Sequence, residues 1–252
     1  MTDPCNPDHR AHALGANPVN GAAAVPDPQP RIRGKESREE SSTRSPRAGA
    51  AGVDARRLSA ALAAFDTANV DDPNTEAVGE ARLPREFLYG RRMSRMLSGY
   101  APDASEAVQL AVRCQHLRRW EIPRERYPRH REGYLAWRRD LASFHAAGAA
   151  AILQAVGYPE TMVARVASLV RKEQLKSDPE AQLVEDVAAL VFLEHYLQSF
   201  VADHPELEKS RLAEIVYRTL GKMSEEGRRA AHPILARLDP AITAAVRDRP
   251  AR

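Results

Sequence analysis

After residue 54, apolar residues recur at every third or fourth position along most of the chain, a spacing typical of α-helices that bury one face. The first such stretch starts at Asp54, a suitable N-cap, and continues through Leu58, Ala61, Leu62 and Phe65. No alternating pattern of useful length indicates a β-strand, and no internal repeat is visible. The pattern therefore predicts an all-α fold in the form of a single helical bundle.

Capping residues, glycines and prolines divide this helical pattern into separate elements. We predict a loop over 70–84 and an irregular segment over 118–133, the latter rich in arginine and proline. The helix that begins after Asp178 is apolar around most of its circumference, which places it in the middle of the bundle. The predicted helices cover residues 54–69, 85–100, about 105–116, 132–156, 159 to about 173, 179–201, 206–220 and 224–238.

The two ends of the chain differ from the middle in composition. Residues 1–53 are rich in proline, alanine, arginine and serine, and the first fifty contain no aromatic residue. Such a segment cannot bury enough apolar surface to offset the entropy lost on ordering. We therefore expect a disordered arm over 1–53, one helical domain over 54–238, and a frayed basic tail over 239–252.

Charge and cysteine content narrow the classes of function. The net charge of +3 is spread among interspersed acidic and basic residues, so nucleic-acid binding through the basic arm is a minor alternative. Cys5 and Cys114 lie in different predicted regions, which argues against a structural disulfide. With no secretory signal and no apolar run near the ~18–20 residues that span a membrane, we expect a cytoplasmic protein without membrane contact.

Four ionisable residues interrupt the apolar stripes of four successive predicted helices: His116, His145, Glu173 and Asp186. Each has an ordinary structural explanation, such as a hydrogen-bonded core histidine or a carboxylate paired with arginine. Together they could meet in one cavity, because helical bundles build metal sites from imidazole and carboxylate groups on facing helices. The donors suit Mn²⁺, Fe²⁺, Zn²⁺ or Ni²⁺ equally.

Basic residues stand next to these four in the sequence. Guanidinium and ammonium groups bind phosphate well, although a solvated charged loop is the simpler interpretation. The candidates for phosphate binding are Arg118, Arg119, Arg124, Lys172 and Lys176.

Four segments carry a resemblance to known families: LYGRRMSRML, RCQHLRRWEIPR, YLAWRRDLASFHA and LVRKEQLKSDPEAQLVEDVAALVFLEHY. In this order, over roughly residues 60–235, they resemble a family known as domain of unknown function 4202 (DUF4202), which has no assigned activity. More remotely, they are similar to the HD-domain phosphohydrolases, in which a bound metal activates water for attack on a phosphate ester.

The remote resemblance implies that the helical bundle is HD-like and that four residues have particular roles. His116, His145 and Asp186 would hold the metal, and Glu173 would be a catalytic group that binds the metal or orients the attacking water. The sequence departs from the HD pattern at two points: the aspartate of the His-Asp doublet is missing, and Tyr89 stands where an early histidine is usual.

Two functions follow as hypotheses. The first is a metal-dependent hydrolase acting on a small phosphorylated or nucleotide substrate. The alternative is a non-catalytic helical module that binds an anionic ligand or a protein partner.

Overall fold

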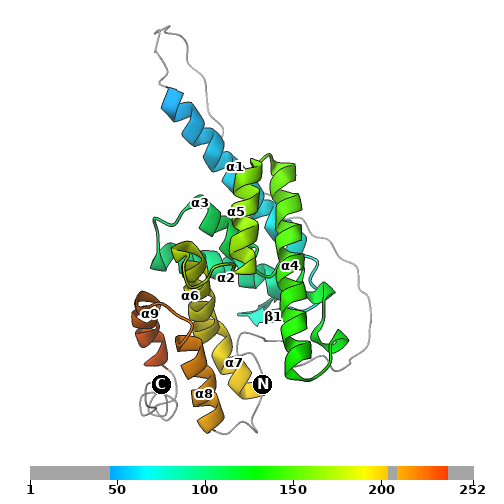
Figure 1. Ribbon diagram of the computed structural model, residues 1–252, viewed down its shortest axis with the longest axis vertical. Helices are drawn as coiled ribbons and strands as arrows, with labels where there is room; N and C mark the ends of the chain where they lie inside the picture. Colours follow the sequence, from blue (N-terminus) through cyan, green and yellow to red (C-terminus); the bar gives the residue numbers. More distant parts are fainter. Residues whose placement is uncertain (1–45, 204–208, 238–252) are drawn as a thin grey trace.

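The computed structural model describes residues 46–203 and 209–237 (Figure 1). Most of the predicted arm and the whole predicted tail, residues 239–252, lie outside the described residues. Helices dominate the described part of the chain, as the apolar spacing predicts, and a single two-stranded antiparallel sheet accompanies them. The elements are α1 Pro46–Asn69, β1 Thr75–Val78, β2 Ala81–Pro84, α2 Arg85–Tyr100, α3 Glu106–Arg113, α4 Arg131–Val156, α5 Glu160–Arg171, α6 Pro179–Val191, α7 Leu197–Asp203, α8 Lys209–Leu220 and α9 Glu225–Leu235.

Helices α4 and α5 form a long hairpin that lies beside α1, while α8 and α9 lie at the other end of the molecule (Figure 1). The hairpin turns at Gly157, whose φ of 88° is in the left-handed region that glycine adopts without strain. Helices α2 and α3 cross the middle of the molecule and pack against α6. None of the helices in the described ranges is both long and apolar enough to cross a membrane.

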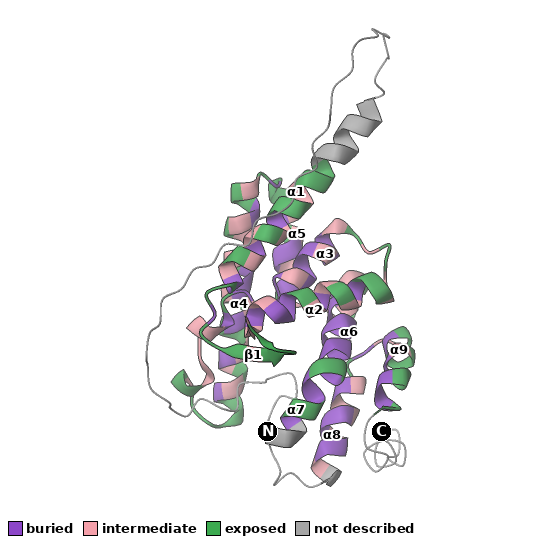
Figure 2. Ribbon diagram, turned by 180° about the vertical axis from the view of Figure 1, so that it is seen from behind, coloured by how far each residue is buried: buried purple, intermediate pink, exposed green. Residues whose placement is uncertain are grey.

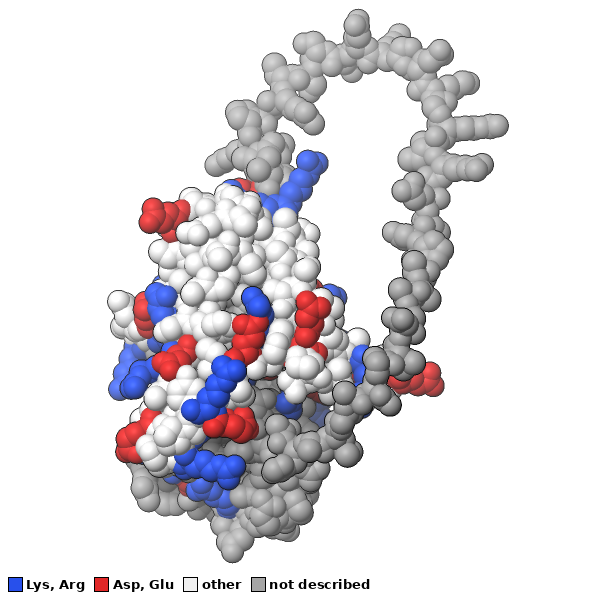
Figure 3. Space-filling model, turned by 90° about the vertical axis from the view of Figure 1, so that its right-hand side faces the viewer, with Lys and Arg blue, Asp and Glu red and all other residues white. Residues whose placement is uncertain are grey.

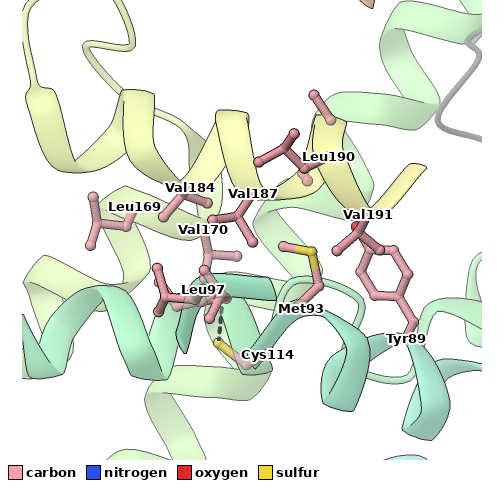
Figure 4. Packing of buried hydrophobic residues seen from close by; sticks show 14 of the residues in the cluster. Tyr89, Met93, Leu97, Cys114, Leu169, Val170, Val184, Val187, Leu190 and Val191 are labelled. Carbon is pink, nitrogen blue, oxygen red and sulfur yellow. Dashed lines mark hydrogen bonds between the residues drawn. The ribbon is translucent and has the colours of Figure 1, made fainter. Parts of the chain in front are cut away.

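Helix α6 is the centre of the bundle, as its nearly uniform apolar character predicts (Figure 2). Asp178 caps it by accepting hydrogen bonds from the backbone N–H groups of Glu180 and Ala181, and Pro179 occupies the first turn. A short π-helix, Phe192–Tyr196, joins α6 to α7. The core brings residues of α2, α5 and α6 together with Cys114 (Figure 4), including Tyr89, Met93, Leu97, Leu169, Val170, Val184, Val187 and Leu190.

The structure differs from the predicted elements at two places near the start of the domain. Helix α1 begins at Pro46, so residues 46–53 are helical although the sequence predicts an arm there. The predicted loop over 70–84 contains the hairpin of β1 and β2, which turns at Gly79 with a φ of 59°. The sequence shows no alternation of apolar and polar residues here, because each strand has only four residues and is largely exposed. Neither strand therefore has a buried apolar face.

Candidate functional site

A cavity of about 350 Å³ opens among α2, α4, α6, the turns after α3 and α5, and the loop between α8 and α9. This volume is within the range of small-molecule sites. Two histidines, His116 and His145, line it. Among the described residues of the lining, Glu185 is the acidic one, and six are arginine or lysine: Arg119, Arg138, Arg139, Arg171, Lys172 and Lys222. We call this cavity the histidine pocket.

His116 is held in a fixed orientation by two residues of α2. Its Nδ1 lies 3.0 Å from Oε2 of Glu86, a carboxylate that is buried in the first turn of the helix. The ring of Tyr89 stacks on the imidazole, with 3.9 Å between centroids and 8° between planes. Because a carboxylate oxygen can only accept, Nδ1 of His116 carries the hydrogen of this bond. In the neutral ring, the other nitrogen, Nε2, therefore carries the lone pair.

Glu86 is itself fixed through its backbone. Oδ2 of Asp72 accepts a hydrogen bond from the backbone N–H of Glu86 at 2.9 Å. The buried amide of Asn69 donates to the backbone carbonyl of Glu86 at 3.2 Å and accepts from the backbone N–H of Arg118 at 2.8 Å. Asn69 at the end of α1 thus connects the helix that carries Glu86 to the turn that carries His116.

Arg119 extends this cluster of charged groups. Its Nε lies 4.0 Å from Oε1 of Glu86, and its guanidinium carbon lies 4.9 Å from the ring centroid of Trp137 on α4. The preceding residue, Arg118, adopts a left-handed conformation with a φ of 51°, so consecutive side chains diverge: Arg118 is exposed and Arg119 is buried. A planar cation held against an aromatic face is already ordered before any ligand arrives.

His145 is buried in the wall of the pocket. Its Nδ1 lies 2.8 Å from the carbonyl oxygen of Leu117, and the centroid of its ring is 6.0 Å from that of His116. Its Nε2 is buried and has no hydrogen-bond partner among the described residues. Burial, reinforced by the charges of His116 and Arg119, holds the pKa of His145 well below its ordinary value.

The lowered pKa of His145 predicts a stability that depends on pH. In the unfolded chain the imidazole takes up a proton near pH 6.5, whereas in the folded chain it stays neutral to lower pH. The free energy of unfolding should therefore fall as pH drops below about 6.5, with a slope from this group of at most about 1.4 kcal/mol per pH unit. Denaturant titrations between pH 5 and 8 would measure it.

The variant His145→Asn isolates this effect, because it removes the titrating ring and keeps a donor for Leu117. His195, whose pKa is also lowered by burial and by Arg92, is present in both proteins and cancels in the comparison. Equal slopes below pH 6.5 in the two proteins would show that His145 makes no contribution.

Glu185 reaches the pocket from α6 and forms an ion pair with Lys172. Burial raises the pKa of this carboxyl, but the positive charges of Lys172, Lys222 and Arg138 outweigh burial and lower the pKa overall. Lys172 ends α5 in a left-handed conformation with a φ of 55°, which places it in the turn between α5 and α6. The pocket thus has an ionised carboxylate surrounded by cations.

Of the four residues expected to share a cavity, the structure brings together the two histidines only. Glu173 lies outside the histidine pocket, where its exposed carboxylate pairs with Arg171 at 2.6 Å. Its assignment assumed that the helical register of α5 continues, but the helix ends at Arg171 and the left-handed Lys172 breaks the register. The predicted catalytic role of Glu173 therefore has no support from its position.

Asp186 is buried, as predicted, but it faces α9 and is not part of the pocket lining. Its carboxylate accepts hydrogen bonds from the backbone N–H of Ser224 at 2.8 Å, from the Ser224 hydroxyl and from the amide of Gln182 at 2.9 Å. Ser224 is in turn the N-cap of α9. The position of Asp186 therefore indicates a structural role at the start of α9, away from the two histidines with which it was expected to bind a metal.

The five predicted phosphate-binding cations are also divided. Arg119 and Lys172 line the histidine pocket, whereas Lys176 is exposed outside it. Arg118 is exposed and pairs with Glu121. Arg124 donates to the backbone carbonyls of Tyr127 and Pro128 at 2.9 and 2.8 Å, so it holds the irregular segment together.

The sequence analysis missed several lining residues and the Glu86 carboxylate that holds His116, and one signal could have found Arg138. Arg138 precedes His145 by seven residues, two helical turns, and so lies on the same face of α4. For Glu86 there was no comparable signal, because its partner His116 is thirty residues away. Within the described residues, no set of three or more histidine, cysteine or acidic side chains is arranged to hold a metal ion.

The fold and the pocket define the class of this protein: an all-helical protein with a basic, histidine-containing pocket. A family model matches residues 59–246, more than half of the chain, and its description is domain of unknown function (DUF4202). The chain belongs to this family, in agreement with the resemblance of its sequence motifs. No curated protein and no solved structure matches the chain significantly.

Proposed function

We propose that the histidine pocket binds a small phosphorylated molecule, nucleotides included, and that the protein hydrolyses it with His116 as the acid–base group. The observation that carries this proposal is the grouping of six cationic side chains around two histidines whose Nδ1 atoms are both engaged. Arginine donates paired, directed hydrogen bonds to phosphate oxygens, and lysine attracts them as a point charge. Arg119, already packed on Trp137, would bind phosphate with little loss of conformational freedom.

The pair of Glu86 and His116 supports the catalytic part of the proposal. A carboxylate that accepts from Nδ1 leaves Nε2 with a lone pair and makes it a stronger base. In the proposed reaction Nε2 takes a proton from water as the water oxygen bonds to phosphorus. The P–O bond to the alcohol breaks, and the alcohol oxygen takes up the proton. Nearby cations would stabilise the charge on the phosphate oxygens during this step.

The metal expected from the HD resemblance fits the pocket incompletely. Each histidine has its Nδ1 bonded to an oxygen, as metal-binding histidines commonly do. Glu173 and Asp186, however, point elsewhere, so the proposed set of ligands is reduced to two imidazoles. A divalent ion would need its remaining ligands from the substrate or from water, and the hydrolysis above does not depend on one.

A binding module without turnover is the second candidate. It is favoured by the ion pair between Lys172 and Glu185, because a carboxylate held ionised by cations is not a proton donor at neutral pH. Both candidates predict binding of phosphorylated anions, and they differ only in the release of phosphate.

Thermal unfolding with added ligand tests the shared prediction. A phosphorylated ligand at about a hundred times its Kd should raise Tm by about 5–10 °C, in the presence of a chelator as well as without one. Lys222→Gln should weaken the binding several-fold, whereas Lys176→Gln should leave it unchanged, because only the first of these exposed lysines lines the pocket. Equal affinities in the two variants would place the binding site elsewhere.

Phosphate release from a panel of esters and nucleotides tests the catalytic part. His116→Gln should lower turnover about 10²–10⁴-fold while the ligand-induced rise in Tm persists. Binding without any phosphate release in the wild-type protein would leave the binding module as the function.

A further inference from the structure

We propose that the histidine pocket selects phosphorylated molecules that also carry a free hydroxyl group, and that Nε2 of His145 is the acceptor that recognises this hydroxyl. The inference rests on the proposed function, since it concerns the ligand of the same pocket. The ligand class is a phosphorylated sugar or polyol, either free or as the ribose phosphate of a nucleotide.

The hydrogen bond of His145 fixes its tautomer. A backbone carbonyl can only accept, so Nδ1 carries the hydrogen that is donated to Leu117. The lowered pKa of the ring keeps it neutral at physiological pH. A neutral imidazole has one hydrogen on its nitrogens, and Nε2 of His145 therefore presents a lone pair.

This lone pair has no partner within the described part of the chain, although the side chain is only 4% exposed. Buried polar atoms in folded proteins are nearly always hydrogen-bonded, and an unsatisfied one is costly. His145 lines the histidine pocket, so a ligand in that pocket is the natural source of a donor. Nε2 itself is closed off from solvent, so a ligand must displace a neighbouring side chain to reach it.

The chemistry of the pocket determines what kind of donor fits. Ionised phosphate oxygens are acceptors only, so they are attracted by the arginines and lysines but repelled by the lone pair of His145. A hydroxyl group of the same ligand can donate to Nε2. Because the ring centroids of His145 and His116 are 6.0 Å apart, this hydroxyl would lie close to the phosphate on which His116 acts.

Matched pairs of ligands test the inference on the full wild-type chain, without any substitution. Glycerol 3-phosphate is compared with propyl phosphate, which lacks its hydroxyls, and AMP is compared with its 2′,3′-dideoxy form. The ligand without hydroxyls leaves Nε2 of His145 unsatisfied, so it should bind about 10–100-fold more weakly than the hydroxylated member of its pair. Calorimetry measures both affinities. The first pair reports on free polyol phosphates and the second on nucleotides; a preference in either pair supports the inference.

Two substitutions locate the preference at His145. His145→Asn keeps a donor for the Leu117 carbonyl and removes the acceptor, so the preference should fall to less than threefold while the affinity for propyl phosphate stays within threefold. His145→Gln places an amide oxygen near the position of Nε2 and should restore part of the preference. Circular dichroism and Tm verify that both variants are folded. If either variant fails to fold, the comparison of the ligand pairs on the wild-type protein still tests the inference.

Three results would overturn the inference. The first is equal binding of both members of each ligand pair to the wild-type protein. The second is a preference that survives in folded His145→Asn. The third is stoichiometric binding of Mn²⁺ or Zn²⁺ alone that His145→Asn abolishes, because Nε2 would then be a metal ligand. If phosphorylated compounds bind without a hydroxyl preference, the proposed function stands and only this inference fails; if none binds, both fail.

Discussion

Replacing Asp186 with alanine is expected to lower the free energy of unfolding by about 2–4 kcal/mol. The buried carboxylate accepts from Gln182 and from the backbone and hydroxyl of Ser224, and the hydroxyl of Tyr100 lies 3.4 Å away. Alanine leaves these donors without an acceptor and loosens the start of α9. Denaturant unfolding followed by circular dichroism measures the change.

Two control variants separate this role from chemistry in the pocket. Asp103→Ala removes an exposed carboxylate and should change stability by less than about 0.5 kcal/mol. Ser224→Ala removes the cap of α9 and should cost about 1 kcal/mol. Below its melting temperature, Asp186→Ala should bind phosphorylated ligands as the wild type does. A stable variant that had lost this binding would instead support the metal-ligand assignment from the sequence.

Replacing Trp137 with alanine should be more damaging, at about 3–5 kcal/mol of unfolding free energy. Trp137 is completely buried, and its indole N–H donates to the carbonyl of Ile122 at 2.9 Å. The guanidinium groups of Arg119 and Arg124 lie over its ring. The substitution therefore opens a cavity, leaves a carbonyl unsatisfied and releases Arg119 from its support beside the histidine pocket.

This variant should lose ligand affinity as well as stability, and the two losses can be measured separately. Trp137→Phe keeps most of the packing and the aromatic face but loses the hydrogen bond, so it should cost about 1–2 kcal/mol with nearly unchanged ligand binding. Trp120→Ala, at a partly exposed tryptophan of the same segment, should cost less than Trp137→Ala. If Trp137→Ala bound ligand normally at low temperature, Arg119 would not depend on the indole for its position.

The helices could be predicted because their signals are local. Asp178 followed by a proline defines the start of α6, Ser105 caps α3, and Gly157 ends α4, each through residues within one turn of the boundary. The charges on the face shown in Figure 3 are interspersed, as the sequence suggests, and no large area of one sign appears there. The hairpin of β1 and β2 was missed because its exposed strands have no buried face to produce a pattern.

The site was harder to predict because α6 is buried on almost every side. On such a helix the adjacent acids Glu185 and Asp186 both interrupt an apolar surface, and the sequence cannot tell which neighbour each will face. The structure shows Glu185 facing the histidine pocket and Asp186 facing α9. His145 was identified because it interrupts the apolar stripe of α4, a helix that is only partly buried. His116 lines the pocket as expected, but it lies in the turn after α3 and not on the predicted helix, because α3 ends at Arg113.

The double hydrogen bond of Asn69 has a consequence for how this pocket keeps its shape. The amide of Asn69 joins the first turn of α2 at Glu86 to the turn at Arg118, so it helps to set the distance between the carboxylate of Glu86 and the imidazole of His116 from a position outside the pocket lining. A substitution at the end of α1 can therefore alter the contact between Glu86 and His116 without changing any residue of the pocket lining.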